Sequence, residues 1–167
     1  EGAAGEKDGR LDAFLDRGIY KVLLHADAEG SGDAALTVHP FTELSTPEIP
    51  RLPEIKRIDT ALGDFQQRSY WLEIEQRRVV AIEAAGRNLA ELRLWKDGNW
   101  LVDATPSTDE VEPLPGKPLA VRRIVTTLEP GLYQLIAYGG PDLPWAKTSD
   151  EHPLYLRMGV PTIADAG

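Results

Sequence analysis

The chain has 167 residues, of which 42% are hydrophobic and 27% charged, so it is long and apolar enough to bury one core, and wholesale disorder is not expected. Lys and Arg total 18 against 27 for Asp and Glu, and the net charge of −9 repels nucleic-acid phosphates and anionic lipid headgroups. We therefore expect no nucleic-acid partner. No membrane insertion is expected either, because no apolar run approaches the roughly 20 residues of a spanning helix.

The first 56 residues are expected to form three segments. Residues 1–10, EGAAGEKDGR, lack a hydrophobic signal core and are predicted to be a disordered lead-in. Residues 11–44 are predicted to contain an N-terminal β-hairpin, because residues 19–26 alternate apolar and polar side chains and residues 34–38 follow a turn. Residues 45–56 are predicted to be a Pro-rich linker, since their prolines cannot donate hydrogen bonds to a sheet.

Residues 57–163 carry strand signals at short intervals, and helical periodicity is scarce. Asp97-Gly98 between two of them is typical of a tight hairpin turn, because glycine readily takes a positive φ and aspartate tolerates it. The signals are IKRIDTAL, SYWLEIE, RVVAIEAA, AELRLWK, NWLVDA, LAVRRIVTTL, LYQLIAY and PLYLRMGV. We predict an all-β fold, an antiparallel jelly-roll-like β-sandwich with an additional N-terminal β-hairpin.

The chain also contains an internal repeat with an offset that places Gly131 opposite Gly18. Each copy has alternating residues, a turn ending in glycine, a strand with tyrosine, a polar loop and one more strand. Leu11, Ala13, Leu15, Gly18, Tyr20, Val22 and Leu24 align with Ile124, Thr126, Leu128, Gly131, Tyr133, Leu135 and Ala137. The first copy is interpreted as the end of a preceding repeat or as an appended element, and a coincidence between two β-hairpins is the alternative.

Residues 58–160 resemble the bacterial pre-peptidase C-terminal domain family. The resemblance rests on an acidic turn at Gly63-Asp64, an aromatic strand, a hairpin and a final strand with the pattern L-x-x-G-x-Y-x-L. Residues 11–38 resemble the last third of the whole family pattern. The strand, hairpin and final-strand residues are Tyr70, Leu72, Leu92, Leu94, Asp97, Gly98, Leu128, Gly131, Tyr133 and Leu135. The resemblance implies a non-catalytic β-sandwich appended to secreted or envelope-associated bacterial proteins, including a tandem within a large surface protein.

No cofactor is expected. Some members of that family use acidic calcium sites, but only Asp64 can be matched to such a site in this sequence. With no cysteine, disulfides, thiolate catalysis and zinc–thiolate sites are excluded, while the compartment stays open.

The sequence carries little that indicates catalysis. None of the serines lies in a G-x-S-x-G motif, and His25 and His39 are interpreted as structural residues. His152 follows Asp150 and Glu151, so it could bind a hard cation or titrate, although a solvated polar loop is the alternative. Carboxylates at 109, 110 and 112 are interpreted as a solubilising acidic loop. We predict that the protein is not an enzyme, with a small hydrolase as an open alternative.

The aromatic residues favour a binding role. Tyr70 and Trp71 are adjacent in a strand and must point to opposite faces, so one of them is expected outside the core. Trp95 and Trp100 flank the Asp97-Gly98 turn and are expected to pack against each other across the hairpin. Exposed tryptophans and tyrosines could instead stack on sugar rings, which makes a carbohydrate-binding module the alternative function.

The loop of residues 139–153 is long, and its prolines stiffen it. We interpret it as a surface loop that contacts a neighbouring domain, or as a loop whose Trp145 covers the end of the sandwich. The candidate contact residues are Trp145, Tyr138, Trp71, Asp142 and His152. We predict an accessory or interaction module of a secreted, periplasmic or cell-surface bacterial protein, whose partner is another protein, a neighbouring domain of a larger chain, or a glycan.

Overall fold

A computed structural model describes residues 9–25, 32–141, 143 and 151–159. It divides into two units, Glu1–Pro40 and Phe41–Gly167, and the second unit contains all the strands of the described residues. Among the residues described, no helix is long and apolar enough to cross a membrane.

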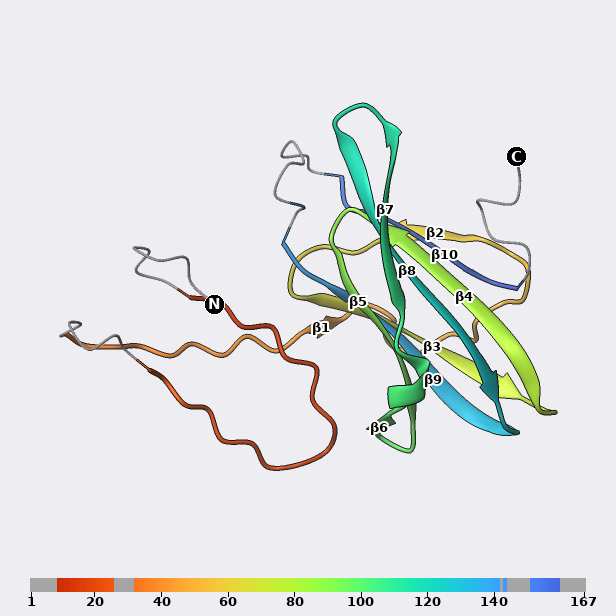
Figure 1. The fold of residues 1–167 in the computed structure, drawn as a ribbon, viewed down its shortest axis with the longest axis horizontal. Coiled ribbons are helices and arrows are strands. Elements are labelled where there is room, and N and C mark those ends of the chain that lie inside the picture. The colour runs from red at the N-terminus through yellow and green to blue at the C-terminus, as the bar shows by residue number, and fades with distance from the viewer. Residues whose placement is uncertain (1–8, 26–31, 142, 144–150, 160–167) are drawn as a thin grey trace. The chain divides into compact units, whose positions relative to one another are not determined.

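The second unit is a sandwich of two five-stranded sheets (Figure 1). All neighbouring strands run antiparallel except the short β1, which pairs with β3 in parallel. Sheet A has the order β1 (Thr42–Glu43), β3 (Gln66–Ile74), β9 (Gly131–Gly139), β5 (Leu89–Lys96) and β6 (Asn99–Trp100). Sheet B has the order β2 (Ile58–Ala61), β10 (Pro153–Met158), β4 (Arg78–Gly86), β8 (Lys117–Leu128) and β7 (Ser107–Leu114). A single 3-10 turn, η1 (Val102–Ala104), follows β6.

The core lies between the sheets and is filled by alternate residues of the long strands. Leu72, Leu94 and Leu135 face inward from sheet A, while Ile82 and Ile124 face inward from sheet B. Successive side chains of a strand point to opposite faces, so the sequence alternation sorts each strand into a core face and an outer face. The predicted all-β sandwich is therefore confirmed.

Two local predictions are also confirmed, one about a turn and one about the orientation of two aromatic side chains. Asp97 and Gly98 both have positive φ angles, 53° and 78°, as a tight two-residue hairpin turn requires. Tyr70 lies in the core, whereas its neighbour Trp71 points away from it, so the two rings do occupy opposite faces of β3.

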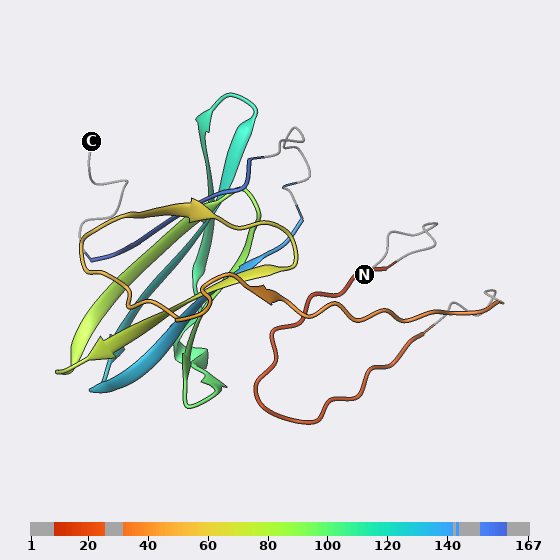
Figure 2. The same ribbon diagram turned by 180° about the vertical axis from the view of Figure 1, so that it is seen from behind.

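The sandwich begins earlier in the chain than the sequence indicated. Residues 45–56, expected to be a linker, lie along both sheets: Arg51 forms a parallel bridge with Trp71 of sheet A, and Glu54 forms one with Met158 of sheet B. The amide of Leu52 donates to the Trp71 carbonyl, and its side chain is buried. Figure 2 shows this segment passing between β1 and β2. The amides between the prolines can still pair, as those of Leu52 and Ile55 do, so the segment covers sheet edges rather than connecting separate domains.

β7 is a second element in which the structure differs from the sequence-based prediction. Residues 107–114, STDEVEPL, were interpreted in part as an acidic loop, but they pair with β8 at the edge of sheet B. All eight residues are exposed, and in Figure 1 the hairpin of β7 and β8 extends beyond the other strands. Charged side chains on such an edge hinder pairing with another chain.

The predicted N-terminal β-hairpin is not seen among the described residues of the first unit. Those residues, 9–25 and 32–40, contain no strand, and side chains such as Val22 and Leu36 are exposed. Two strands without a third strand or a covering layer are at best marginally stable in water, so alternation by itself does not produce a sheet here.

Candidate interaction surface

The outer face of sheet A carries an unusual concentration of aromatic side chains. The strand register defines this face, because directly opposed residues of neighbouring strands share one side of a sheet. One row across the sheet is Gln67, Tyr138 and Glu91, the next is Ser69, Ile136 and Arg93, the third is Trp71, Gln134, Trp95 and Trp100, and the fourth is Glu73 and Leu132. We call these residues the outer face of sheet A.

The first two rows are packed tightly. Tyr138 and Ile136 are only 6% and 7% exposed, and Phe41 lies edge-on against Tyr138 with ring centroids 5.4 Å apart. Burial raises the pKa of Tyr138 to about 12, while the neighbouring Trp95 and the positive charge of Arg93 act in the opposite direction. The Tyr138 phenol is protonated at neutral pH.

The third row is anchored by a cation–π contact. The guanidinium carbon of Arg93 lies 3.6 Å from the centroid of the Trp100 ring, and the Arg93 side chain also reaches Glu91 at 3.5 Å. Trp95 and Trp100 are direct register partners across the β5–β6 hairpin, as the turn between them predicts. Only 8% of Trp95 is exposed. Arg93 and the two tryptophans thus form a rigid base on this side of the sheet.

The other end of the face is more open. Leu132 is 50% exposed, Trp71 is partly exposed, and Glu73 forms an exposed ion pair with Arg51. Apolar and charged groups therefore meet at the surface around Trp71.

A carboxylate fixes the edge of this face. Glu43 of β1 accepts hydrogen bonds from the Ser69 hydroxyl, from Gln67 Nε2 at 3.0 Å and from the Ser45 amide at 2.8 Å. Burial by itself would raise the pKa of Glu43, but these hydrogen bonds together outweigh burial and lower it. The ionised carboxylate therefore holds β1 on β3.

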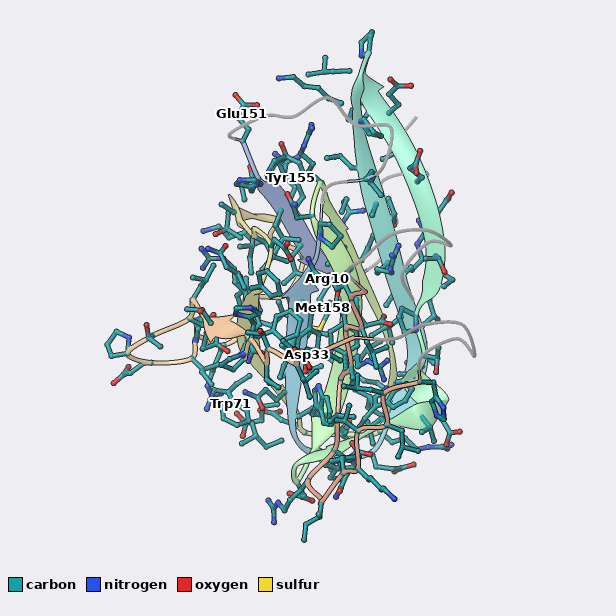
Figure 3. The ribbon with its side chains drawn as sticks, turned by 90° about the vertical axis from the view of Figure 1, so that its left-hand side faces the viewer. Arg10, Asp33, Trp71, Glu151, Tyr155 and Met158 are labelled. Carbon is teal, nitrogen blue, oxygen red and sulfur yellow. The ribbon has the colours of Figure 1, made fainter. Side chains whose placement is uncertain are left out.

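The candidate residues named from the sequence are not all brought together. Tyr138 and Trp71 share the outer face of sheet A, two rows apart. Trp145 and Asp142 lie outside the described residues. His152 precedes β10 of the other sheet, and Figure 3 shows its neighbour Glu151 far from Trp71.

The surroundings of His152 indicate a structural role. Its Nδ1 lies 2.8 Å from Asn88 Oδ1, while Asn88 Nδ2 donates to the Gly140 carbonyl at 3.0 Å. Because that second bond fixes the amide orientation, His152 donates through Nδ1. Its neighbour Glu151 lies 3.2 Å from Lys117 Nζ. These contacts join both ends of the 139–153 loop to the β4–β5 turn.

Two shallow depressions border the outer face of sheet A, one at Glu73 and the other at Trp100. The larger, about 410 Å³, is lined by Arg51, Glu54, Glu73, Glu75, Gln76 and Arg78. Arg51 pairs with Glu73 and Arg78 with Glu54, so most of its charges are neutralised within the wall. The other, about 320 Å³, lies beside Trp100 and Tyr133.

No metal centre emerges within the described part of the chain, where no three His, Asp or Glu residues gather in a group that could hold an ion. Asp64, the residue matched to an acidic turn, accepts a hydrogen bond from the Phe65 amide at 2.9 Å. Its carboxylate thus serves the turn before β3.

Sequence reasoning missed Arg93 and Ile136 as members of the aromatic surface. Arg93 is the chain neighbour of the core residue Leu94, and Ile136 is the neighbour of Leu135. Because successive side chains of a strand point to opposite faces, both point outward. Their gathering with Trp71 depends on strand order, in which β9 lies between β3 and β5, and the sequence does not reveal that order.

Comparisons with known proteins give one similar structure to report. No protein-family model matches the chain, and no curated protein matches it. A solved structure, the pre-peptidase C-terminal domain of a collagenase from Bacillus anthracis, matches over 75% of this chain and 100% of its own, with 11% sequence identity and a TM-score of 0.39.

Proposed function

We propose that this chain is a non-catalytic accessory module of a secreted or envelope-associated protein, and that the outer face of sheet A binds a neighbouring protein domain. The observation that carries the proposal is the gathering of Trp71, Trp95, Trp100 and Tyr138, with Arg93, on a face that is turned away from the core. The sequence resemblance to domains appended to secreted proteins supports the location.

The composition of this face suits a protein partner. The outward side of an antiparallel sheet is ordinarily polar, and apolar residues that gather there mark interaction surfaces. Tryptophan, tyrosine and arginine are the residues that most often dominate binding energy in protein interfaces. Here the partly exposed Trp71 and Leu132 would contact the partner, while buried Trp95 and Tyr138 hold the surface rigid.

The charge of the chain further restricts the kind of protein surface that could bind. The chain carries a net charge of −9, and Glu73 and Glu91 lie on the proposed face. Long-range attraction therefore favours a basic protein surface. The pairing of Arg51 with Glu73 lies at the rim of the face, where a salt-dependent effect on association rate is expected.

Carbohydrate binding remains a second candidate because the third row places Gln134 between Trp71 and Trp95. An amide beside aromatic rings can bind sugar hydroxyls while the rings stack on the sugar. A stacking platform needs several open ring faces. Trp95 is only 8% exposed, Trp71 and Trp100 are partly exposed, and Arg93 covers one face of the Trp100 ring, so this row offers few open ring faces. A protein surface therefore fits the geometry better.

Site-specific photocrosslinking in the producing cell tests the proposal. A photoreactive residue is placed at Trp71 or Leu132 of the natural polypeptide, with Val79 and Val125 as controls. The controls are exposed apolar positions on the outer face of sheet B. We expect positions 71 and 132 to yield adducts with the same protein segment, identified by mass spectrometry, and the controls to yield none.

Equal crosslinking from all four positions, or none from positions 71 and 132, would overturn the protein-binding assignment. The glycan arm uses tryptophan fluorescence of the purified chain titrated with N-acetylglucosamine oligomers and cello-oligosaccharides. Saturable quenching that Trp71→Ala abolishes would transfer the function to glycan binding, whereas a flat titration together with the selective crosslink supports the protein partner.

A further inference from the structure

The first unit exposes an uncommon amount of apolar side chain. We call residues 11–25 and residues 34–38 the N-terminal segments. The exposed large hydrophobic side chains within them are Leu11, Leu15, Ile19, Tyr20, Val22, Leu23, Leu24, Leu36 and Val38. A contiguous run of this kind in water indicates a surface that a partner normally covers.

The same chain contains a buried counterpart of these segments. The aligned positions of the second copy, Ile124, Leu128, Tyr133, Leu135 and Ala137, are all at most 3% exposed. Their partners in the first copy are between 51% and 82% exposed where they are large hydrophobic residues. Equivalent residues are therefore core in one copy and uncovered in the other.

The same hydrogen bond occurs at the aligned tyrosine of each copy. The Tyr133 hydroxyl donates to the Glu129 carbonyl at 2.8 Å, and the Tyr20 hydroxyl donates to the Asp16 carbonyl at 2.7 Å. Both bonds reach back four residues across a turn that contains glycine. A tyrosine that bonds to the backbone a few residues upstream, near the start of a strand, is a feature of β-sandwich corners. The described residues of the first unit therefore contain the tyrosine hydrogen bond of such a corner but no strand.

The second copy also explains why the N-terminal segments do not pair with each other. Their counterparts are β9 and β10, which belong to different sheets. β9 lies between β3 and β5 in sheet A, and β10 lies between β2 and β4 in sheet B. Two strands related in this way are connected across the sandwich and share no ladder. The absence of a hairpin from the described part of the first unit agrees with this arrangement.

We propose that the N-terminal segments are the last two strands of another β-sandwich of the same topology, and that an open sandwich lacking these strands is their partner. In that partner, residues 20–25 insert between strands equivalent to β3 and β5. Residues 34–38 insert between strands equivalent to β2 and β4. Because β2 to β8 precede β9 in chain order, the partner strands belong to a preceding domain of the same polypeptide.

A second copy of this chain fits less well as the partner. Its own β9 and β10 already occupy the central positions of sheets A and B, so insertion would require both to leave. β9 and β10 bury residues such as Leu135 and Leu156 completely or nearly so. The proposal concerns the N-terminal segments and does not depend on the outer face of sheet A.

Hydrogen exchange of the natural polypeptide that contains this chain tests the proposal. We expect the amides of residues 20–25 and 34–38 to be protected at least about 1,000-fold there, because strands in the core of a sheet open only by large-scale unfolding. In the isolated 167-residue chain the same amides should exchange without protection. Unprotected exchange in the natural polypeptide would overturn the proposal.

Two substitutions identify the buried side of the strand. Val22 aligns with fully buried Leu135, whereas Lys21 aligns with partly exposed Gln134 on the outer face. In the natural polypeptide, Val22→Asp should abolish the protection of residues 20–25 while Lys21→Asp retains it, and neither should change the melting of the isolated chain.

Equal effects of the two substitutions would contradict the assignment of faces. Protection that appears in the isolated chain only at concentrations where light scattering shows a dimer would also overturn the proposal, because the partner would then be a second copy.

Discussion

The two copies of the repeat show how little of a β-strand is determined locally. Val22 is 61% exposed and lies in no strand, whereas its counterpart Leu135 is 0% exposed at the centre of sheet A. Both copies have the same alternation, the same glycine two residues before tyrosine and the same tyrosine hydrogen bond. The corner is therefore local, while the strand depends on its neighbours.

The energetic reason lies in burial. Complete burial of a large aliphatic side chain stabilises a fold by about 1.5–3 kcal/mol, and fixing the backbone of one residue costs about 1–2 kcal/mol. A strand whose side chains stay in water gains almost none of the stabilisation from burial, but its backbone still bears the full cost of being ordered. β9 has two strand neighbours and sheet B beneath it, and the first unit has no ladder within its described residues.

The largest difference between the copies is expected for truncation of the aligned aliphatic residues. Leu135→Ala should lower the free energy of unfolding of this chain by about 2–5 kcal/mol, because it leaves a cavity at a fully buried site. Val22→Ala should change it by less than about 0.5 kcal/mol. Urea denaturation followed by circular dichroism measures both. Similar losses for the two variants would mean that Val22 is part of a folded core.

The next largest difference between the copies is expected for substitution of their glycines, Gly131 and Gly18. Gly131 has a φ of 153°, which a residue with a Cβ adopts only under strain, whereas Gly18 lies outside the positive-φ region. A methyl group at Gly131 would also come within 3.2 Å of Lys96 Nζ, a flexible end that can move. Gly131→Ala should therefore destabilise the sandwich by about 1–3 kcal/mol through its backbone.

Gly18→Ala is the matched control, and its unfolding curve should coincide with that of the unsubstituted chain. If Gly131→Ala also leaves the midpoint unchanged, the backbone at that turn relaxes without cost, and the corner contributes little to the second copy either.

Much of the sandwich was predictable because its long strands are amphipathic. β4, β5, β8 and β9 alternate over enough of their length to be located as strands, although each also buries adjacent residues. β7 carries no such signal, because both of its faces are exposed and backbone pairing with β8 defines it. The position of residues 45–56 along the sheets was not predicted for a related reason. Their proline pattern is shared by true linkers and by chains that lie along a sheet edge.

The candidate surface was predictable only in part. The sequence placed one of Tyr70 and Trp71 outside the core without deciding which, and the pairing of Trp95 with Trp100 followed from the turn between them. That Tyr138 lies on the same face as Trp71 depends on β9 pairing with β3, a contact between residues about 70 positions apart. Sequence periodicity carries no information about such long-range order.

The hydroxyls of the two corner tyrosines should have a smaller effect. Tyr133→Phe removes the hydrogen bond to the Glu129 carbonyl inside a folded unit and should lower the free energy of unfolding by about 0.5–1.5 kcal/mol. Tyr20→Phe should have no effect on the unfolding of this chain. In the natural polypeptide, the preceding inference predicts that Tyr20→Phe becomes destabilising, and differential scanning calorimetry of both proteins would show whether a second transition shifts.

The smallest effect concerns the junction at which the chain enters sheet A. The pKa of Glu43 is lowered in the folded protein, so the stability that its carboxylate contributes is fully present above the unfolded pKa of about 4.5. That contribution is lost as the pH falls through the lower, folded pKa. Since Glu43 is partly exposed, Glu43→Gln should cost less than about 1 kcal/mol at pH 7.

Glu43→Gln should also flatten the decline in stability below pH 4.5, which urea titrations at a series of pH values would measure. Asp12→Asn is the control from the first unit, because the Arg10–Asp12 pair lies outside the sandwich and such surface pairs contribute little. A steep acid decline that persists in Glu43→Gln would assign it to other carboxylates, whereas a decline removed by Asp12→Asn would mean that the first unit folds together with the second. The two variants therefore test directly whether cooperative structure begins at β1.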